Sequence, residues 1–368
     1  MSQPLLSFYV IAYNQAAFVR DAIRAAFAQT WNPLEIILSD DCSEDDTYSI
    51  MEEESRQYQG SHTLRLNRNR TRLGVGGHIN AVLRMARGEF IVASAGDDVS
   101  VPHRTERLYA RYRDLKGQAP LVYSNIVEID RHGAVLQYRD FAGNDARWST
   151  VDEPGWSLSE HLDGRALPVH GASFGYSKNL FSAFGELAAG VVFEDDVLNW
   201  RAELLGMISL IREGLVLHRN HPGQITNPYD PSTDLREAVW RRKAVAYSRV
   251  AALRQNIRDT QIVCNHGDLA PRVAATVIAA LRPRLKKEET LYTSLYAPWP
   301  RRLAVVVKHA ALFGCQEDRK TLLLRALLPL WAYTATLRLV RWLRKGSWLE
   351  LYAHRRRRNW AGSNRDGK

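Results

Sequence analysis

The stretch that decides the fold runs from residue 63 to residue 98 and reads TLRLNRNRTRLGVGGHINAVLRMARGEFIVASAGDD. Residues 63–67 and 89–94 are short runs rich in apolar side chains, typical of strands, and residues 76–86 between them have a helical pattern. Two strands joined by a helix form a βαβ unit. The stretch therefore predicts a parallel sheet, because parallel strands need a long crossover connection.

The same alternation continues toward the N-terminus. Strands are predicted at 7–13 and 34–39, and helices at 15–29 and 47–58. We therefore expect an α/β fold, Rossmann-like, with a mostly parallel sheet flanked by helices. Ligands of such sheets bind beyond the carboxyl ends of the strands, and acidic residues follow two of these ends, Asp40–Asp41 and Asp97–Asp98.

The pattern changes after about residue 121. A strand, a turn at 131–133 and a returning strand come first, and shorter strands and helices follow as far as residue 227. Helical patterns dominate beyond residue 228, after a segment crowded with Asn, Pro, Asp and Ser. The sequence predicts three parts: an α/β domain at 1–227, a helical C-terminal region at 228–345 and a basic tail at 346–368.

Composition describes an ordinary globular protein, with 45% hydrophobic and 24% charged residues in a chain of 368. The net charge of +10 is concentrated at residues 338–368, where ten Lys and Arg face two acids. The remaining body is nearly neutral, which argues against nucleic-acid binding. Three scattered cysteines build neither a disulfide framework nor a zinc site and favour a reducing compartment. The N-terminus reads as a first strand, not a signal peptide.

Acidic residues gather at a third place, Glu194–Asp195–Asp196. Carboxylates suit Mg²⁺ or Mn²⁺, which commonly join one or two carboxylates to a substrate phosphate. A nucleotide diphosphate at the mouth of a parallel sheet meets that requirement, and a separate carboxylate can serve as a general base. The alternative is that these acids lie in surface loops. Asp97 and Asp98 favour the functional interpretation, since they end an apolar strand at the expected ligand edge.

Several motifs together resemble the inverting glycosyltransferases of family 2, which have the GT-A fold. The resemblance covers roughly residues 5–227. Its motifs are FYVIAYNQAAFVRDAIRAAFAQTW, IILSDDCSEDDT, ARGEFIVASAGDDVSVPHRTERL, HGASFGYSKNLFSAFGEL, FEDDVLNWRAELLG and LVLHRNHPGQIT, in that order.

The resemblance implies a role for residues near the donor. Asp41 matches the aspartate that binds the nucleotide base, and Tyr13 the aromatic residue beside that base. Asp97 matches the last acid of the family's Asp-X-Asp motif, which holds the metal on the diphosphate, and Asp98 supports it. The first acid of that motif is replaced by Ala95. We therefore expect a divalent metal, Mn²⁺ or Mg²⁺, bound mainly when the sugar nucleotide is present.

Two further positions complete the site that the resemblance implies. Asp195 matches the base that deprotonates the acceptor hydroxyl, and His221, in HRNH, matches a metal ligand or phosphate contact. Other candidates have simpler interpretations. His78 could reach the ligand, but we expect it on an exposed helix face. We expect Asp45 and Asp46 at a helix N-terminus, and Trp200 either in the core or beside the acceptor.

The C-terminal region has the composition of an interfacial membrane anchor, with Trp and Tyr interleaved with arginines. Its longest uncharged stretch, residues 326–337, is too short to span a bilayer, which takes about 20 residues. The alternatives are a helical cap on the catalytic domain and a solvated tail. We expect a cytoplasmic protein, peripheral on the inner face of the cell membrane.

The function expected is transfer of a sugar from a nucleotide-sugar donor, UDP-linked by preference, to a lipid-linked or other saccharide acceptor. This is the chemistry of bacterial surface-polysaccharide synthesis, for example of O-antigen. Two alternatives stay open: a sugar-nucleotide-binding protein without turnover, and a nucleotidyltransferase on a similar sheet.

Overall fold

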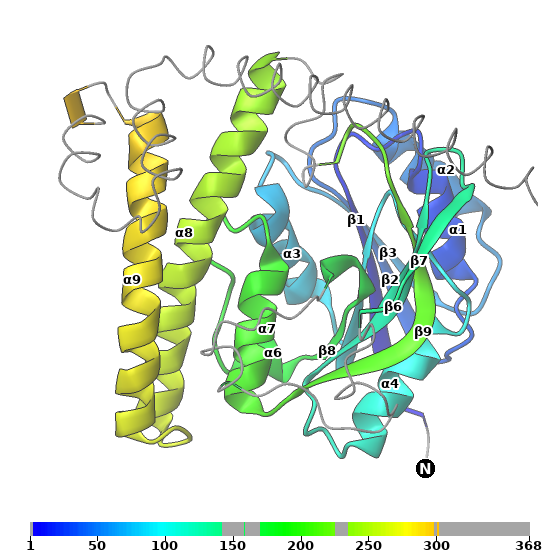
Figure 1. Cartoon of the computed structure of the whole chain (residues 1–368). Coiled ribbons are helices and arrows are strands. Elements are labelled where there is room, and N and C mark those ends of the chain that lie inside the picture. Colours follow the sequence, from blue (N-terminus) through cyan, green and yellow to red (C-terminus); the bar gives the residue numbers. More distant parts are fainter. Residues whose placement is uncertain (1–2, 142–157, 159–169, 225–234, 298–299, 302–368) are drawn as a thin grey trace, which may run out of the picture. The chain divides into compact units, whose positions relative to one another are not determined.

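The computed structural model describes residues 3–141, 158, 170–224, 235–297 and 300–301 (Figure 1). The chain divides into two compact units, one of residues 1–221 and 247–286 and the other of residues 222–246 and 287–368. Residues 247–286 thus belong to the first unit, which also holds every predicted site residue. The three-part division at residues 227 and 345 stays a prediction, and the 326–337 stretch and the basic tail lie outside the described residues.

The N-terminal half of the first unit is the predicted parallel sheet, in the strand order β3-β2-β1-β4. Its elements are β1 (Leu6–Ala12), α1 (Val19–Phe27), β2 (Leu34–Asp40), α2 (Thr47–Gln57), β3 (Thr63–Arg68), α3 (Gly74–Met85) and β4 (Phe90–Ala95). Strands β1 and β2 are buried almost throughout because helices cover both faces of the sheet, which explains their continuous apolar runs.

The second half of the sheet is mixed. It consists of β5 (Val99–Ser100), α4 (Arg104–Asp114), β6 (Leu121–Ile129), β7 (Val135–Arg139), the 3₁₀ turn η2 (Gly171–Ser173), β8 (Gly175–Ser177), α6 (Asn179–Ser182), α7 (Glu194–Leu205) and β9 (Ile208–Arg219). Strand β8 joins β4 and β6 antiparallel to both, and β9 runs parallel to β6. Over the segment of β9 the sequence predicts several short strands, whereas the structure has a single strand of 12 residues. The predicted α/β fold is confirmed.

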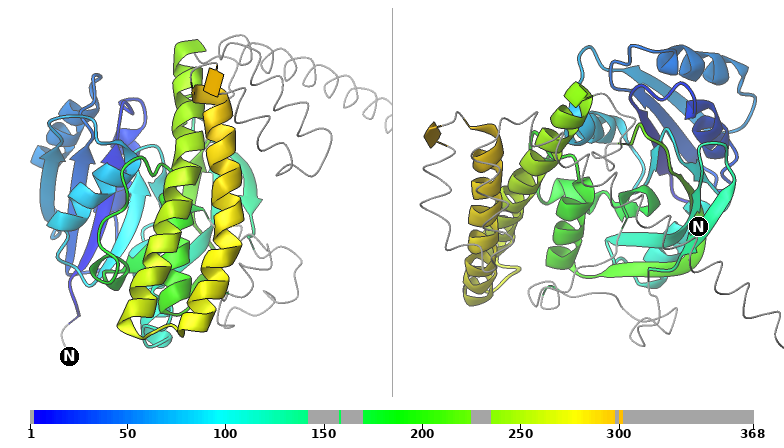
Figure 2. Two further views of the ribbon diagram at one scale, coloured as in Figure 1. Left: turned by 90° about the vertical axis from the view of Figure 1, so that its left-hand side faces the viewer. Right: turned by 45° about the horizontal axis from the view of Figure 1, so that its top comes forward.

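Two apolar cores hold the sheet, one on each face (Figures 1 and 2). On one face α1 presents Val19, Ala22, Ile23 and Ala26, a stripe at the spacing of a buried helix side, together with α2 and α4. On the other face lie α3, α6 and α7.

Two long helices, α8 (Leu235–His266) and α9 (Pro271–Tyr296), confirm the helical C-terminal region. Within the first unit, α8 packs on α7 through Trp200, whose indole N–H donates to the Asn256 carbonyl at 3.0 Å. Arg201 and Asp259 form a fully buried ion pair at 2.8 Å. Trp200 is therefore a core residue. Within the described residues, no helix is long and apolar enough to cross a bilayer.

Candidate active site

Three of the predicted site residues follow neighbouring strands at one edge of the sheet. Tyr13 follows β1, Asp41 follows β2, and Asp97 follows β4 by two residues. Since β1 lies between β2 and β4 and all three run parallel, their carboxyl ends meet at the same edge. The sheet therefore gathers the residues assigned to the donor by resemblance.

The Asp41 carboxylate is buried and organises the loop before α3. One of its oxygens accepts from the Asn69 amide and from the Leu73 backbone N–H, both at 2.8 Å. The other accepts from the Gly74 N–H at 2.8 Å. Asp41 thus ties the end of β2 to the first residue of α3.

Beside Asp41, the ring of Tyr13 is covered by a cation. The guanidinium carbon of Arg72 lies 3.9 Å from the centre of the Tyr13 ring, a cation–π contact. Sequence reasoning missed Arg72. The available signal was the cluster of arginines at positions 68, 70 and 72, which follows β3 toward the same edge of the sheet.

The loops after β1 and β2 are held together by side chains. The Asn14 backbone N–H donates to the Ser43 hydroxyl at 2.9 Å, and the Asn14 side-chain oxygen accepts from the Glu44 N–H at 2.9 Å. The two bonds of Asn14 hold the loop after β1, which contains Tyr13, against the loop after β2, which contains Asp41. The sequence predicts that both Asp45 and Asp46 cap α2. Asp45 accepts from the Thr47 N–H at 3.0 Å, whereas Asp46, the residue before the helix, makes no side-chain capping bond.

The prediction for His78 is wrong. This residue is 3% exposed, and one of its ring nitrogens lies 2.7 Å from the Ser39 hydroxyl at the end of β2. Burial lowers the pKa of His78, against the opposing charges of Asp41 and Asp40. His78 is therefore a buried residue that packs and hydrogen-bonds at the end of β2.

Asp97 and His221 meet, although 124 positions separate them in the chain. One carboxylate oxygen of Asp97 lies 2.9 Å from His221 Nε2. Within the described residues no group of three or more His, Cys, Asp and Glu side chains forms a metal site. A carboxylate and an imidazole nevertheless fit a divalent ion whose remaining ligands are diphosphate oxygens and water, which is how Mg²⁺ is commonly held.

Asp98 has a different environment from its neighbour. It is 1% exposed, and one carboxylate oxygen accepts from the Arg219 backbone N–H at 3.0 Å and lies 3.0 Å from His218 Nδ1. Burial has the largest single effect and by itself would lower the pKa of His218. The hydrogen bond to Asp98 and the charges of Asp98, Asp97 and Glu128 together outweigh burial, so the net shift of the pKa is upward. Asp98 joins the β4–β5 turn to the end of β9. Its predicted part in metal binding stays a prediction.

Asp195 is the second residue of α7 and lies between two other acids in the sequence. Burial, followed by the charge of Asp196, raises the pKa of Asp195, and burial together with Asp195 raises that of Glu194. A carboxylate with a raised pKa is a stronger base than a solvated one. Asp196 is exposed and has its backbone N–H 3.1 Å from the Asp195 carboxylate.

The turn η2 links the Asp195 region to the Asp97–Asp98 turn. A Cβ placed on Gly171 would lie 2.8 Å from the Glu194 carboxylate and 3.6 Å from Asp195 Cβ, so these residues are in direct contact. The preceding residue, His170, packs its ring 4.3 Å from that of His218. Sequence reasoning missed His170, although it begins one of the motifs quoted above.

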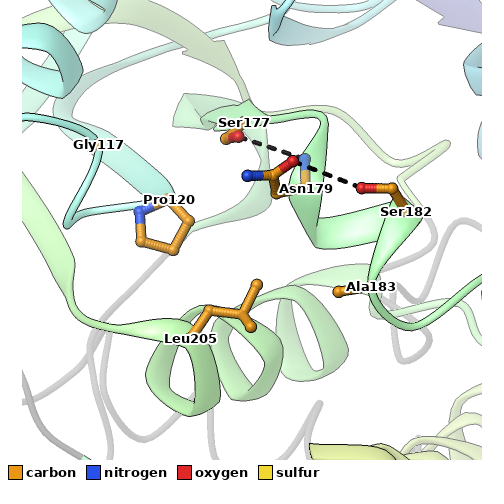
Figure 3. A pocket seen from close by; sticks show the side chains of 7 residues that line it. All are labelled: Gly117, Pro120, Ser177, Asn179, Ser182, Ala183 and Leu205. Carbon is orange, nitrogen blue, oxygen red and sulfur yellow. Dashed lines mark hydrogen bonds between the residues drawn. The ribbon is translucent and has the colours of Figure 1, made fainter. Parts of the chain in front are cut away.

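One cavity, of about 350 Å³, is lined by residues just before β6, in β8 and α6, and at the end of α7 (Figure 3). Its walls include Ser177, which pairs with the first residue of β4, as well as Pro120 and Leu205. None of the predicted site residues lines it. This cavity is therefore separate from the candidate active site.

Comparison with known proteins agrees with the fold. Residues 7–156 match the family model described as glycosyl transferase family 2. An uncharacterized glycosyltransferase of Rickettsia typhi is 26% identical over 243 residues, 64% of this chain and 70% of the relative. The succinoglycan biosynthesis protein ExoO of Rhizobium meliloti is 30% identical over 178 residues, 48% of this chain and 47% of the relative.

Among solved structures, Staphylococcus aureus TarS, residues 1–349, matches with a TM-score of 0.50 at 16% identity, covering 90% of this chain and 87% of that one. This likeness concerns the fold. An α/β sheet of this kind binds its ligands beyond the carboxyl ends of its strands, which is where the acids of this chain lie. The match to glycosyl transferase family 2 covers residues 7–156, less than half of the chain, and over these residues the chain is similar to that family.

Proposed function

We propose that the protein is an inverting glycosyltransferase that moves a sugar from a nucleotide-sugar donor, UDP-linked by preference, to a hydroxyl of a saccharide acceptor. The observation that carries the proposal is the Asp97–His221 pair at the same sheet edge as Asp41 and Tyr13. A diphosphate bound beside the pair and a base bound beside Tyr13 would fill that edge.

Donor binding uses the loops after β1 and β2. Asp41 holds the start of α3 with both carboxylate oxygens and presents the base-binding wall. Tyr13 offers a ring face that Arg72 covers at 3.9 Å, so a bound base would share this face with Arg72 or displace it. Uracil and thymine have the same pairing edge, and we favour uracil because of the resemblance.

Asp97 and His221 would hold Mn²⁺ or Mg²⁺ on the diphosphate, with Asp98 supporting the turn. When bound, such an ion stabilises the negative charge that develops on the leaving phosphate. The chain itself holds Asp97 through the β4–β5 turn and His221 just beyond β9. Because the site has few protein ligands, we expect metal affinity to rise strongly when the nucleotide is present.

Asp195 is the proposed general base. Its raised pKa suits removal of a proton from the acceptor hydroxyl, which attacks the anomeric carbon from the face opposite the diphosphate. The bond to the diphosphate oxygen breaks as the new glycosidic bond forms, so the configuration inverts. No covalent intermediate with the protein is needed.

The acceptor that we propose is a lipid-linked saccharide at the cytoplasmic face of the membrane, in assembly of a surface polysaccharide. The name of the succinoglycan relative supports a polysaccharide product. The aromatic and basic composition of the C-terminal region supports contact with anionic lipid. A peripheral location follows from these two arguments.

The test is nucleotide release from a panel of sugar nucleotides with Mn²⁺ or Mg²⁺, with and without membrane lipid extract. Wild type is compared with Asp97→Ala and Asp195→Asn, and with Asp114→Ala as a control, since Asp114 is an exposed acid at the end of α4. We expect one donor to turn over in the presence of lipid, both site variants to lose turnover by about 10²–10⁴-fold, and the control to retain it.

Different outcomes separate the remaining alternatives. Donor binding without turnover on any lipid favours a binding protein, and release of pyrophosphate from a nucleoside triphosphate favours a nucleotidyltransferase. Retention of the donor's anomeric configuration in the product, measured by NMR, would contradict the inverting mechanism. EDTA should abolish turnover and added Mn²⁺ should restore it.

A further inference from the structure

Arg219, the last residue of β9, is a buried cation directly beside the Asp97–His221 pair. Arg219 is 4% exposed, and each of its three guanidinium nitrogens donates a hydrogen bond. The Nε–H donates to the Asp97 backbone carbonyl at 3.0 Å, one Nη donates to the Arg131 carbonyl at 3.1 Å, and the other to Asp21 at 3.0 Å. Arg219 therefore joins the β4–β5 turn, the β6–β7 turn and helix α1.

Phe18 extends this arrangement to His221. The Arg219 guanidinium lies 5.1 Å from the centre of the Phe18 ring, and the rings of Phe18 and His221 are 4.5 Å apart. His221 is thus in contact with Phe18 as well as with the carboxylate of Asp97 at 2.9 Å. The His221 ring is therefore oriented by Phe18, the residue before α1, and by Asp97.

We infer that Arg219 and Phe18 are positioning residues that hold Asp97 and His221 at the separation needed to share a divalent cation on a nucleoside diphosphate. The inference deepens the proposed function and rests on it. Residues that orient metal ligands commonly matter for affinity by about 10–100-fold. Here a single side chain fixes the backbone of one ligand and, through Phe18, the ring of the other.

Arginine is needed at position 219 for its geometry. The planar guanidinium donates in three directions, to a carbonyl of the β4–β5 turn, a carbonyl of the β6–β7 turn and a carboxylate on α1. A lysine ammonium cannot reach all three acceptors in this plane, and a neutral glutamine also removes the charge that Asp21 pairs with. Both changes should loosen the Asp97 turn relative to His221.

The experiment measures Mn²⁺ binding by its EPR signal, with UDP as the nucleotide, and UDP binding in EDTA by calorimetry. The variants are Arg219→Gln, Arg219→Lys and Phe18→Leu. Arg201→Lys is the matched control, because Arg201 is also a buried arginine, paired with Asp259, but belongs to the α7–α8 contact. Melting temperatures of all four are measured in parallel.

We expect Arg219→Gln to weaken Mn²⁺ binding in the presence of UDP by about 10–100-fold, with about 2-fold or less change in UDP affinity in EDTA. Arg219→Lys and Phe18→Leu should follow in the same direction with smaller effects. The control should lower the melting temperature and leave the Mn²⁺ dependence unchanged.

Unchanged Mn²⁺ binding in a folded Arg219→Gln protein would overturn the inference, as would an equal loss in Arg201→Lys. If Arg219→Gln does not fold, Phe18→Leu decides by the same comparison, since it removes the ring contact and no charge. A wild-type protein that binds no UDP, with or without Mn²⁺, would instead refute the nucleotide assignment, and the inference would fail with it.

Discussion

Asp195 lies between Glu194 and Asp196 in the first turn of α7, and three neighbouring carboxylates repel one another when all are ionised. Burial and the neighbouring charge raise its pKa above that of a solvated aspartate. A general base acts in its ionised form, so activity should fall as the pH is lowered through this raised pKa. The acidic limb of the rate profile should therefore lie at a higher pH than the ordinary carboxylic-acid range.

The measurement is kcat/KM for the donor and acceptor against pH, with the stability of the protein checked at each point. Asp196→Asn removes one of the charges that raise the pKa of Asp195, so the acidic limb should move to lower pH in that variant. An acidic limb in the ordinary aspartate range for wild type, or an unmoved limb in Asp196→Asn, would contradict the assignment of Asp195.

The same shift has a consequence for stability. A carboxyl group whose folded pKa is raised favours folding in its protonated form, so its contribution is present at low pH and is lost as the pH rises through the folded pKa. Removing the buried charge by Asp195→Asn should therefore raise the melting temperature at pH 8 by about 2–4 °C, the effect of 1 kcal/mol in a domain of this size. The increase should vanish at pH 4.

A second prediction at the residue scale concerns backbone strain at Asn14, in the loop after β1. Its φ of 51° lies in the left-handed region, which asparagine tolerates better than alanine, and its side chain accepts from the Glu44 N–H. Asn14→Gly loses the hydrogen bond but keeps an unstrained backbone. Asn14→Ala loses the hydrogen bond and also strains the backbone, so it should be less stable than Asn14→Gly by about 1 kcal/mol in urea unfolding. Equal stability of the two variants would argue against strain at this position.

At the scale of the elements, Gln29 ties α1 to α4. It is 4% exposed. Its amide N–H group donates to the Val101 carbonyl at 2.9 Å, and its carbonyl accepts from the backbone N–H and the hydroxyl of Thr105, at 3.0 and 2.7 Å. A residue that ends one of the family-like motifs thus has a structural role, since it fixes the start of the helix that follows the Asp97 turn.

We expect Gln29→Ala to destabilise the protein by about 2–3 kcal/mol, because it leaves buried donors and acceptors unpaired. The neighbour Thr30 is exposed and makes longer bonds, 3.4 Å to Pro102 and 3.2 Å to Glu106, so Thr30→Ala should cost about 0.5 kcal/mol or less. Urea unfolding of both variants provides the comparison. The donor KM of Gln29→Ala, measured well below its melting temperature, should remain within about 2-fold of wild type.

At the scale of the whole molecule, residues 247–286 are part of the first compact unit. The contact with α7 contains the Arg201–Asp259 pair, and Arg201 also donates to the carbonyls of Leu180 and Gly185 at 3.0 and 2.9 Å. Burial lowers the pKa of Arg201, against the opposing charge of Asp259. The two charges are tolerated in the interior because they compensate each other.

Asp259→Ala should therefore destabilise the protein by about 3–5 kcal/mol, the cost of leaving a buried charge without its partner. Glu52→Ala, which breaks the exposed pair of Glu52 with Arg56, should cost about 0.5 kcal/mol or less. Thermal unfolding of both variants measures the difference. A small effect of Asp259→Ala would mean that α8 contributes little to the stability of the unit that holds the active site.

The sequence by itself determined the βαβ order, the position of acids at strand ends and the resemblance to a family. These properties are local: apolar periodicity selects strand or helix within a few residues, and a strand that ends in Asp97 delivers it to the carboxyl edge of a parallel sheet. The C-terminal helices followed from the same periodicity. The replacement at Ala95 could also be read directly.

The tertiary structure decided which of these residues meet. Asp97 faces His221, whereas Asp98, one position along, turns to His218 and Arg219. His78 is buried under Ser39 even though its helix could have presented it to solvent. Such choices depend on contacts between strands and turns that lie far apart in the chain. Local propensity carries no information about them, because their energy arises only when distant segments pack together.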